Sequence, residues 1–267
     1  MKPKVLVLTG YGINSEEETA ECFNITGSEA EIVHINDVVD GHRKLEDYQI
    51  MVFPGGFSYA DDTGGGNALA NKIKNNLQDD IKKFAQADKL IIGICNGFQI
   101  LTKLGLVPAT EDQYDEPEAT LMHNKTVRLE CRQVDMKKIS KKCIWTKGID
   151  TIRMPIAHGE GNFYVDDEIL TAMKANDQIV FKYIKPDGSP ANGELPFNPN
   201  GALEDIAGIC DKSGRIFGLM PHPERINSFT NRDDWQLQKE KLLRKGKELP
   251  EEGEGLVVFK NASEYFG

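Results

Sequence analysis

Cys95 lies at the centre of the stretch GICNG, residues 93–97, with one glycine two positions before it and another two positions after it. This G-x-C-x-G pattern is the thiol version of the strand-to-helix turn known as a nucleophile elbow. Glycines on both sides remove side chains that would crowd a residue at so sharp a turn. A thiol at the first turn of a helix is favoured as thiolate by the helix dipole. The pattern predicts that Cys95 is a nucleophile, although this stretch alone also fits a small buried core cysteine.

A nucleophilic cysteine needs a base and a group that orients the base. His222 and Glu224 in MPHPER are two residues apart, so in an extended segment they face the same side. His158 and Glu160 in AHGEGN have the same spacing and compete for the role. We expect His222 to be the base, because an apolar run leads into it and the prolines on either side stiffen its position. His158 lies in a looser loop, better suited to shaping a pocket or contacting a partner.

Backbone donors for an oxyanion are predicted at two strand ends. Gly55 and Gly56 in the stretch PGG leave amides exposed after an apolar run, and Asn96 supplies the amide directly after the nucleophile. A tight turn that binds no ligand is the alternative for PGG.

Two other patterns suggest ligands only weakly. The stretch DDTGGG, residues 61–66, is glycine-rich but lacks the G-K-[ST] ending of a phosphate loop, and its aspartates would repel a phosphate. Cys131, Cys143 and His123 are too irregularly spaced for a zinc site. We therefore expect no metal and no cofactor on this chain.

The first hundred residues alternate between apolar strands and helices. Strands are expected in residues 4–12, 29–35, 48–56 and 89–95, with helices from Ser15 to about Phe23 and from Asn67 to about Ala85. Ser15 and Glu18 have the spacing of a capping box. This alternation predicts an α/β fold with a doubly wound, mostly parallel sheet and helices on both faces. Ligands in such sheets bind beyond the carboxyl ends of the strands, where PGG and Cys95 both stand.

The character of the chain changes after Pro108. An acidic loop over residues 111–119 is followed by apolar segments that predict strands, by a hairpin around Lys212 to Gly214, and by a charged helix. The predicted strands are residues 126–134, 149–159 and 178–184; the hairpin spans 206–220 and the helix 232–247. These strands predict an antiparallel addition to the sheet. Because no linker separates the two parts, we predict one domain over residues 1–267, with a C-terminal extension from about residue 226.

Composition narrows the classes of function. The 267 residues carry a formal net charge of −10, which argues against nucleic acid or an anionic membrane as the main partner. Five cysteines form no C-x-x-C pair, as expected in a reducing, cytoplasmic setting. No segment approaches the roughly 20 apolar residues needed to span a bilayer. The apolar run at the N-terminus is too short for a signal peptide.

Taken together, four motifs carry a resemblance to a known family. They are PGGFSYADD, GICNGFQIL, AHGEGN, and FNPNG followed by IAGICDKSGRIFGLMPHPER. From about Lys4 to Arg225 the chain resembles the class I, triad-type glutamine amidotransferases, and among them the glutaminase subunits of phosphoribosylformylglycinamidine synthases. The resemblance implies a flavodoxin-like core and hydrolysis of glutamine to glutamate and ammonia through a γ-glutamyl thioester.

Carried onto this sequence, the resemblance makes Cys95 the nucleophile, His222 the base and Glu224 its orienting carboxylate. Gly56 or Phe57, together with Asn96, would form the oxyanion hole. Our further candidates for contact with the substrate are Gly55, Gln99 and His158. The ammonia would pass to a separate synthetase subunit, with or without a small bridging subunit. That partner would use ATP and Mg²⁺ to convert formylglycinamide ribonucleotide to formylglycinamidine ribonucleotide in purine biosynthesis.

Two alternatives stay open: a stand-alone cysteine hydrolase on the same sheet, and a non-catalytic regulatory subunit with a vestigial triad. The chain also departs from the family in two places. Many small bacterial members have G-D-Y-L-R-A-G after GGFSY, where this chain has ADDTGGGNALA, and the tail beyond Arg225 is longer here. These departures bear on contacts with a partner more than on the chemistry.

Overall fold

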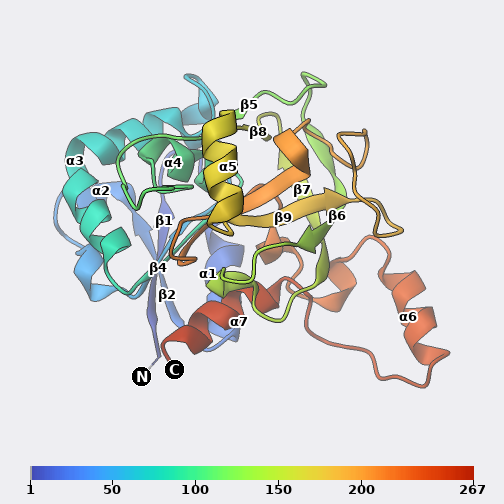
Figure 1. Cartoon of the computed structure of the whole chain (residues 1–267). Helices are drawn as coiled ribbons and strands as arrows, with labels where there is room; N and C mark the ends of the chain where they lie inside the picture. The colour runs from blue at the N-terminus through green and yellow to red at the C-terminus, as the bar shows by residue number, and fades with distance from the viewer. Residues whose placement is uncertain (1) are drawn as a thin grey trace.

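The structure is a computed structural model and describes residues 2–267. A nine-stranded sheet runs through the whole molecule, with the spatial order β2-β1-β3-β4-β11-β10-β9-β6-β7 (Figure 1). The strands are β1 (Lys4–Thr9), β2 (Glu29–His34), β3 (Ile50–Phe53), β4 (Leu90–Ile94), β6 (Glu130–Lys138), β7 (Thr151–His158), β9 (Ile179–Ile184), β10 (Ile206–Cys210) and β11 (Ile216–Leu219). A separate two-stranded sheet pairs β5 (Thr120–Met122) with β8 (Asn162–Tyr164).

One half of the large sheet is parallel. Strand β1 pairs with β2 and β3, β3 with β4, and β4 with β11, all in parallel. The two central strands, β3 and β4, are buried along their whole length. That burial explains their continuous apolar sequences, because helices cover both faces of a doubly wound sheet. The predicted parallel arrangement is confirmed.

The other half is antiparallel. Strand β10 forms a hairpin with β11 and also pairs with β9, which continues through β6 to β7 at the edge. Strands β7, β9, β10 and β11 lie within the segments predicted from the sequence, and the hairpin turn falls where it was predicted. Strand β6 overlaps its predicted segment, residues 126–134, but begins at Glu130 and ends at Lys138. The strand β11 therefore joins the two halves, since it is parallel to β4 on one side and antiparallel to β10 on the other.

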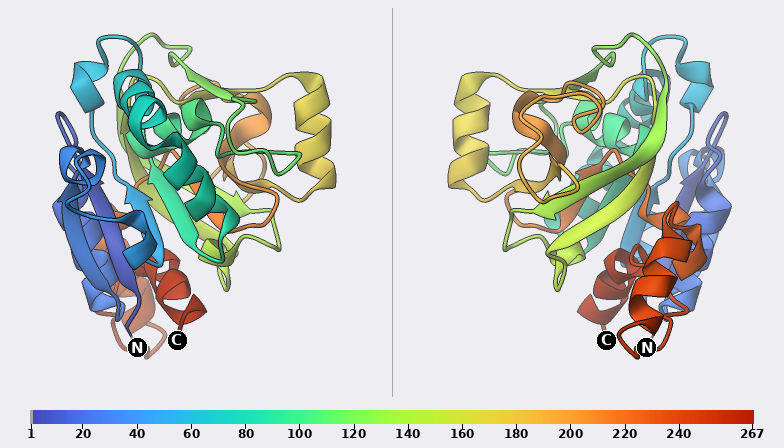
Figure 2. Two further views of the ribbon diagram at one scale, coloured as in Figure 1. Left: turned by 90° about the vertical axis from the view of Figure 1, so that its left-hand side faces the viewer. Right: turned by 90° about the vertical axis from the view of Figure 1, so that its right-hand side faces the viewer.

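Helices cover the two faces of the parallel half, as the two side views show (Figure 2). The helices are α1 (Glu16–Ile25), α2 (Ile35–Val39), α3 (Asn67–Gln86), α4 (Asn96–Leu104), α5 (Asp167–Ala175), α6 (Trp235–Leu243) and α7 (Leu256–Tyr265). Helices α3 and α4 pack against each other, as do α1 and α7. In α3, buried residues recur at a spacing of four, from Leu69 through Ile73, Leu77 and Ile81, which is the spacing of one helix face.

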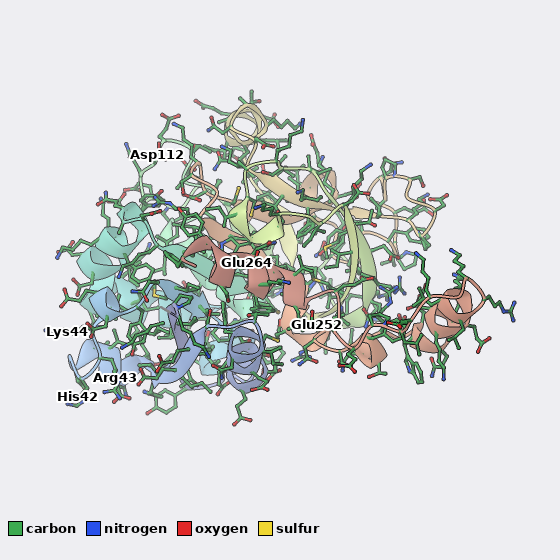
Figure 3. All side chains as sticks on the ribbon, turned by 90° about the horizontal axis from the view of Figure 1, so that it is seen from below. His42, Arg43, Lys44, Asp112, Glu252 and Glu264 are labelled. Carbon is green, nitrogen blue, oxygen red and sulfur yellow. The ribbon has the colours of Figure 1, made fainter. Side chains whose placement is uncertain are left out.

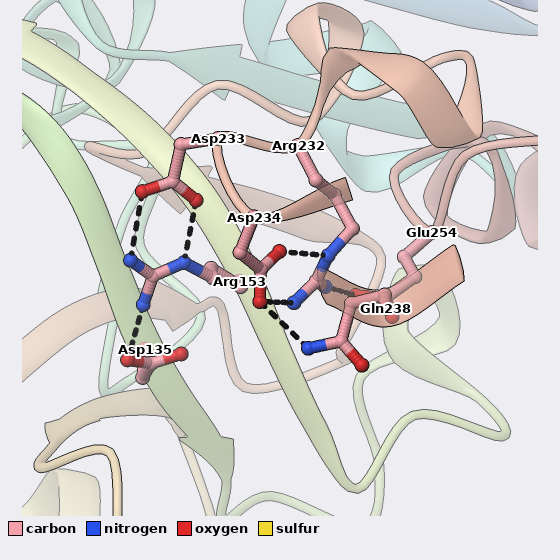
Figure 4. A network of polar contacts seen from close by, with 7 residues as sticks. All are labelled: Asp135, Arg153, Arg232, Asp233, Asp234, Gln238 and Glu254. Atoms are coloured by element: carbon pink, nitrogen blue, oxygen red, sulfur yellow. Dashed lines mark hydrogen bonds and ion pairs between the residues drawn. The ribbon is translucent and has the colours of Figure 1, made fainter. Parts of the chain in front are cut away.

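The segment after Arg225 is anchored to the edge of the sheet by ion pairs (Figure 4). Arg153 of β7 donates to both carboxylate oxygens of Asp233, at 3.0 Å each, and to Asp135 of the neighbouring strand at 2.6 Å. Arg232 in turn bonds to Asp234. This segment includes α6, a helix with no buried residue that projects from the body of the molecule (Figure 1).

Local predictions for two helices needed correction. Ser15 does precede α1, but its side chain makes no capping hydrogen bond, so the predicted capping box is wrong. Its hydroxyl instead accepts a bond from Arg225, which is 210 residues away in the sequence. Helix α6 is shorter than the predicted 232–247. Within residues 2–267, no helix is long and apolar enough to cross a membrane.

Candidate active site

Strand β4 ends at Ile94 and α4 begins at Asn96, so Cys95 forms the whole connection between them. Its backbone has φ 52° and ψ −106°, a strained conformation for a residue with a side chain. Close backbone contacts require glycine at both flanking positions, because a Cβ would collide there. A Cβ on Gly97 would lie 1.8 Å from the carbonyl oxygen of Phe53, and one on Gly93 would lie 2.6 Å from the carbonyl oxygen of Gly97. The predicted nucleophile elbow is present.

Neighbouring strands bring the histidine to this turn. The amide of Cys95 donates to the carbonyl of Leu219, the last residue of β11, at 2.8 Å. Three residues later, His222 donates its own amide to Pro155 of β7 at 2.9 Å. The backbone of His222 is therefore held by β7 just beyond the end of β11, which is the strand beside β4. The carboxyl ends of the parallel strands β4 and β11 meet here, where ligands of such sheets bind.

His222 and Glu224 form a buried pair. Nδ1 of His222 lies 2.5 Å from Oε1 of Glu224, and the side chains are 2% and 0% exposed, respectively. Nε2 of His222 is buried and has no hydrogen-bond partner among residues 2–267. Burial lowers the pKa of His222, but the negative charges of Glu224 and Cys95 outweigh that effect and raise the pKa to about 10. The ring is therefore an imidazolium at neutral pH. Its Nδ1 is bonded to Glu224, and its Nε2 is left for the thiol.

The second H-x-E pair is built differently. His158 faces Asn124, whose side-chain oxygen lies 3.2 Å from its Nδ1, and Glu160 points away to the amide of Gly65. Burial, followed by the charge of His222, lowers the pKa of His158 to about 3. His158 is thus a neutral, buried ring close to His222, with no carboxylate to orient it. The geometry favours His222 over His158 as the base, as the sequence suggested.

The glycine turn after β3 lies against the imidazole. A Cβ on Gly55 would be 2.8 Å from Cε1 of His222, so only glycine fits at that position. Of the two predicted donors from this turn, the amide of Phe57 is already bonded to the carbonyl of Gly12 at 2.7 Å. The amide of Gly56 makes no hydrogen bond within the described chain. Because the Phe57 amide already has an acceptor, the geometry favours Gly56 with Asn96 as the pair of oxyanion donors, and this assignment stays a prediction.

Gln99 was expected to contact the substrate, but both ends of its amide are bonded within the protein. Its Nε2 donates to the carbonyl oxygen of Glu160 at 2.7 Å, and its Oε1 accepts from Asn96 at 2.8 Å. The glycine-rich turn is also occupied, because the amides of Gly65 and Gly66 donate to the carboxylates of Glu160 and Asp61. A phosphate would have to displace both carboxylates, which argues against the phosphate-loop interpretation.

The residues of the irregular zinc pattern do not form a site. His123 is exposed and its Nδ1 lies 3.5 Å from Glu160, and another histidine, His42, is on the periphery of the molecule (Figure 3). Cys131 is exposed whereas Cys143 is buried. Among residues 2–267, no group of three or more histidine, cysteine or acidic side chains could hold a metal ion.

The fold and this Cys-His-Glu constellation define a domain of the triad glutamine amidotransferase class. Comparison with known proteins agrees, because residues 2–266 match the family model of the CobB/CobQ-like glutamine amidotransferase domain. The chain is 56% identical, over 99% of its length and 97% of the relative's, to phosphoribosylformylglycinamidine synthase subunit PurQ of Methanococcus maripaludis strain S2. It is 42% identical, over 98% and 96%, to the subunit of the same name from Dehalococcoides mccartyi.

A solved structure extends this likeness to three dimensions. The structure of PurLQS from Thermotoga maritima contains a chain that matches with a TM-score of 0.73 and 29% identity, covering 100% of both chains. The chain belongs to the PurQ family of phosphoribosylformylglycinamidine synthase subunits.

Proposed function

We propose that this chain is the glutaminase subunit of a phosphoribosylformylglycinamidine synthase. It hydrolyses glutamine to glutamate and ammonia, and the ammonia serves to convert formylglycinamide ribonucleotide to formylglycinamidine ribonucleotide in purine biosynthesis. The observation that carries the proposal is the buried His222–Glu224 pair with its free Nε2, in a chain of the PurQ family whose Cys95 stands at the elbow and acts on the pKa of His222. A stand-alone hydrolase and a regulatory subunit are not favoured.

The chemistry follows from the charges. The Cys95 thiolate attacks the carboxamide carbon of glutamine, and the amides of Gly56 and Asn96 bond to the oxyanion that forms. His222 donates a proton to the nitrogen, so that ammonia leaves and a thioester remains on Cys95. The imidazole, now neutral, takes a proton from water, whose hydroxyl attacks the thioester. Release of glutamate restores the thiolate and the imidazolium, which Glu224 stabilises throughout.

The remaining steps of the reaction would take place on partner subunits. The name PurLQS of the solved complex supports assembly with a synthetase subunit and a small third subunit. We place the use of ATP and Mg²⁺ on the synthetase, and assign no cofactor to this chain. We also propose that the protein is cytoplasmic, in keeping with a purine biosynthesis enzyme and with five free cysteines.

Substitution of the nucleophile tests this proposal. In the enzyme reconstituted with its synthetase, Cys95→Ser should abolish glutamine-dependent amination and leave amination by free ammonia intact. Equal loss of the two activities would reject the division of labour. If the chain were instead a regulatory subunit with a vestigial triad, iodoacetamide would not alkylate Cys95 selectively over the other cysteines.

A further inference from the structure

Two motifs that the catalytic steps do not use lie against each other. Glu160 of the AHGEGN loop, between β7 and β8, accepts the amide of Gly65 with its Oε2 at 2.9 Å. Gly65 belongs to the DDTGGG turn, which leads into α3 and is 95 residues away in the sequence. The backbone carbonyl of Glu160 accepts Nε2 of Gln99 at 2.7 Å. One residue thus holds the start of α3 and the first turns of α4 together.

Further bonds close these contacts into a ring. Oε1 of Gln99 accepts from Nδ2 of Asn96 at 2.8 Å, and the same Nδ2 donates to Oδ1 of Asp61 at 3.1 Å. Asp61 accepts the amide of Gly66 at 3.4 Å, next to the Gly65 amide that Glu160 holds. Oδ1 of Asn96 also accepts the amide of Ser58 at 3.2 Å. The ring therefore connects the residue after the nucleophile to the loop that follows the PGG turn.

That loop needs external support. Tyr59, Ala60 and Asp61 are consecutive non-glycine residues with φ of 54°, 58° and 53°, and each such residue is strained. No side chain caps the N-terminus of α3, where Gly66 occupies the capping position. A carboxylate is the group that a helix N-terminus favours. Glu160, whose side chain is 19% exposed, brings this charge from a distant part of the chain.

We infer that Glu160 is a positioning residue: it closes the hydrogen-bond ring that fixes the loop of residues 57–66 against α4, and with it the separation of the Gly56 and Asn96 amides. This inference rests on the proposed function, because those amides matter as oxyanion donors. Glu160 itself contacts neither Cys95 nor His222 through a hydrogen bond. Its other polar neighbour is Nδ1 of the exposed His123, at 3.5 Å.

Three variants of the full chain, assembled with the synthetase, test the inference. Glu160→Ala removes the acceptor of the Gly65 amide, and Glu160→Gln keeps an amide oxygen in its place. Glu168→Ala is the matched control, since Glu168 lies exposed on α5 and makes no side-chain hydrogen bond within residues 2–267. If Glu160→Ala does not fold, Glu160→Met fills the same volume without an acceptor and takes its place.

Loss of an oxyanion donor costs about 10²–10³-fold in kcat, and a displaced donor should cost a part of that. We expect Glu160→Ala to lower kcat and kcat/KM for glutamine together by about 10–100-fold. The KM for glutamine, amination by ammonia, and alkylation of Cys95 by iodoacetamide should not change, because none of them involves the oxyanion. Glu160→Gln should stay within about threefold of the wild type, since a neutral acceptor is weaker than a charged one by only about half.

Hydrogen exchange supplies a readout that does not depend on activity. Amides of residues 58–66 should exchange faster in Glu160→Ala than in the wild type or in Glu168→Ala. A raised KM at constant kcat, an alanine variant equal to the wild type, or a glutamine variant as impaired as alanine would overturn the inference. If the wild type itself fails to use glutamine, the proposed function is wrong. Unchanged hydrogen exchange in Glu160→Ala would refute the role of Glu160 in the hydrogen-bond ring, whether or not the wild type uses glutamine.

Discussion

Replacement of His222 by alanine should show which of the two H-x-E pairs supplies the catalytic base. His222 carries a proton at neutral pH because its pKa is raised to about 10, and its free Nε2 is the nitrogen beside the thiol. Without this imidazolium, no group donates a proton to the departing ammonia. A general acid or base contributes about 10²–10⁴-fold to a rate, so glutamine turnover should fall by at least about 100-fold.

The same substitution should change the reactivity of Cys95. An imidazolium beside a thiol favours the reactive thiolate, so His222→Ala should slow the alkylation of Cys95 at neutral pH. His158→Ala should leave that rate unchanged. Since the pKa of His158 is lowered to about 3, its ring is neutral from pH 5 to 9 and contributes no charge there.

The assay is the rate of iodoacetamide labelling at Cys95, followed by mass spectrometry from pH 5 to 10. Because His222→Ala leaves the buried Glu224 without its partner, at a cost of about 3–5 kcal/mol, thermal unfolding must accompany each profile. His222→Ala combined with Glu224→Gln removes that uncompensated charge and should keep the slower alkylation. If the His158 variant shifts the profile and the His222 variant does not, the assignment of the triad is wrong.

Three further outcomes are expected. Gly97→Ala should unfold the protein or cost more than about 3 kcal/mol of stability, because its Cβ would lie 1.8 Å from the Phe53 carbonyl oxygen, whereas Gly159→Ala, with no atom within 4 Å, should be neutral in thermal unfolding. Replacing the four cysteines other than Cys95 with alanine should leave a folded enzyme with glutaminase activity, and loss of that activity without unfolding would contradict this. The isolated chain should show little glutaminase activity until its partner is present, since Cys95 is only 4% exposed; full activity of the single chain would refute this.

Much of the fold and the centre of the site could be predicted because they depend on local patterns. The apolar strands, the glycines around Cys95 and the hairpin before His222 each have a sequence signature. The capping box at Ser15 was a local pattern too, but a distant arginine takes the serine hydroxyl. The sequence likewise gave no sign that the Phe57 amide would bond to the carbonyl of Gly12. Contacts between distant segments leave no periodic signal, so local propensity cannot reveal them.

The two H-x-E pairs show why equal spacing did not give equal geometry. After His222 the chain turns into a short 3₁₀ helix, Pro223–Arg225, which brings the Glu224 carboxylate back onto the imidazole. Glu160 instead follows Gly159 and precedes Gly161, and its carboxylate is drawn to the N-terminus of α3. Prolines on both sides restrict the backbone at His222, whereas glycines on both sides let the backbone at Glu160 turn away from His158. The residues between and beside the histidine and the carboxylate therefore decide which pair brings its carboxylate onto its imidazole.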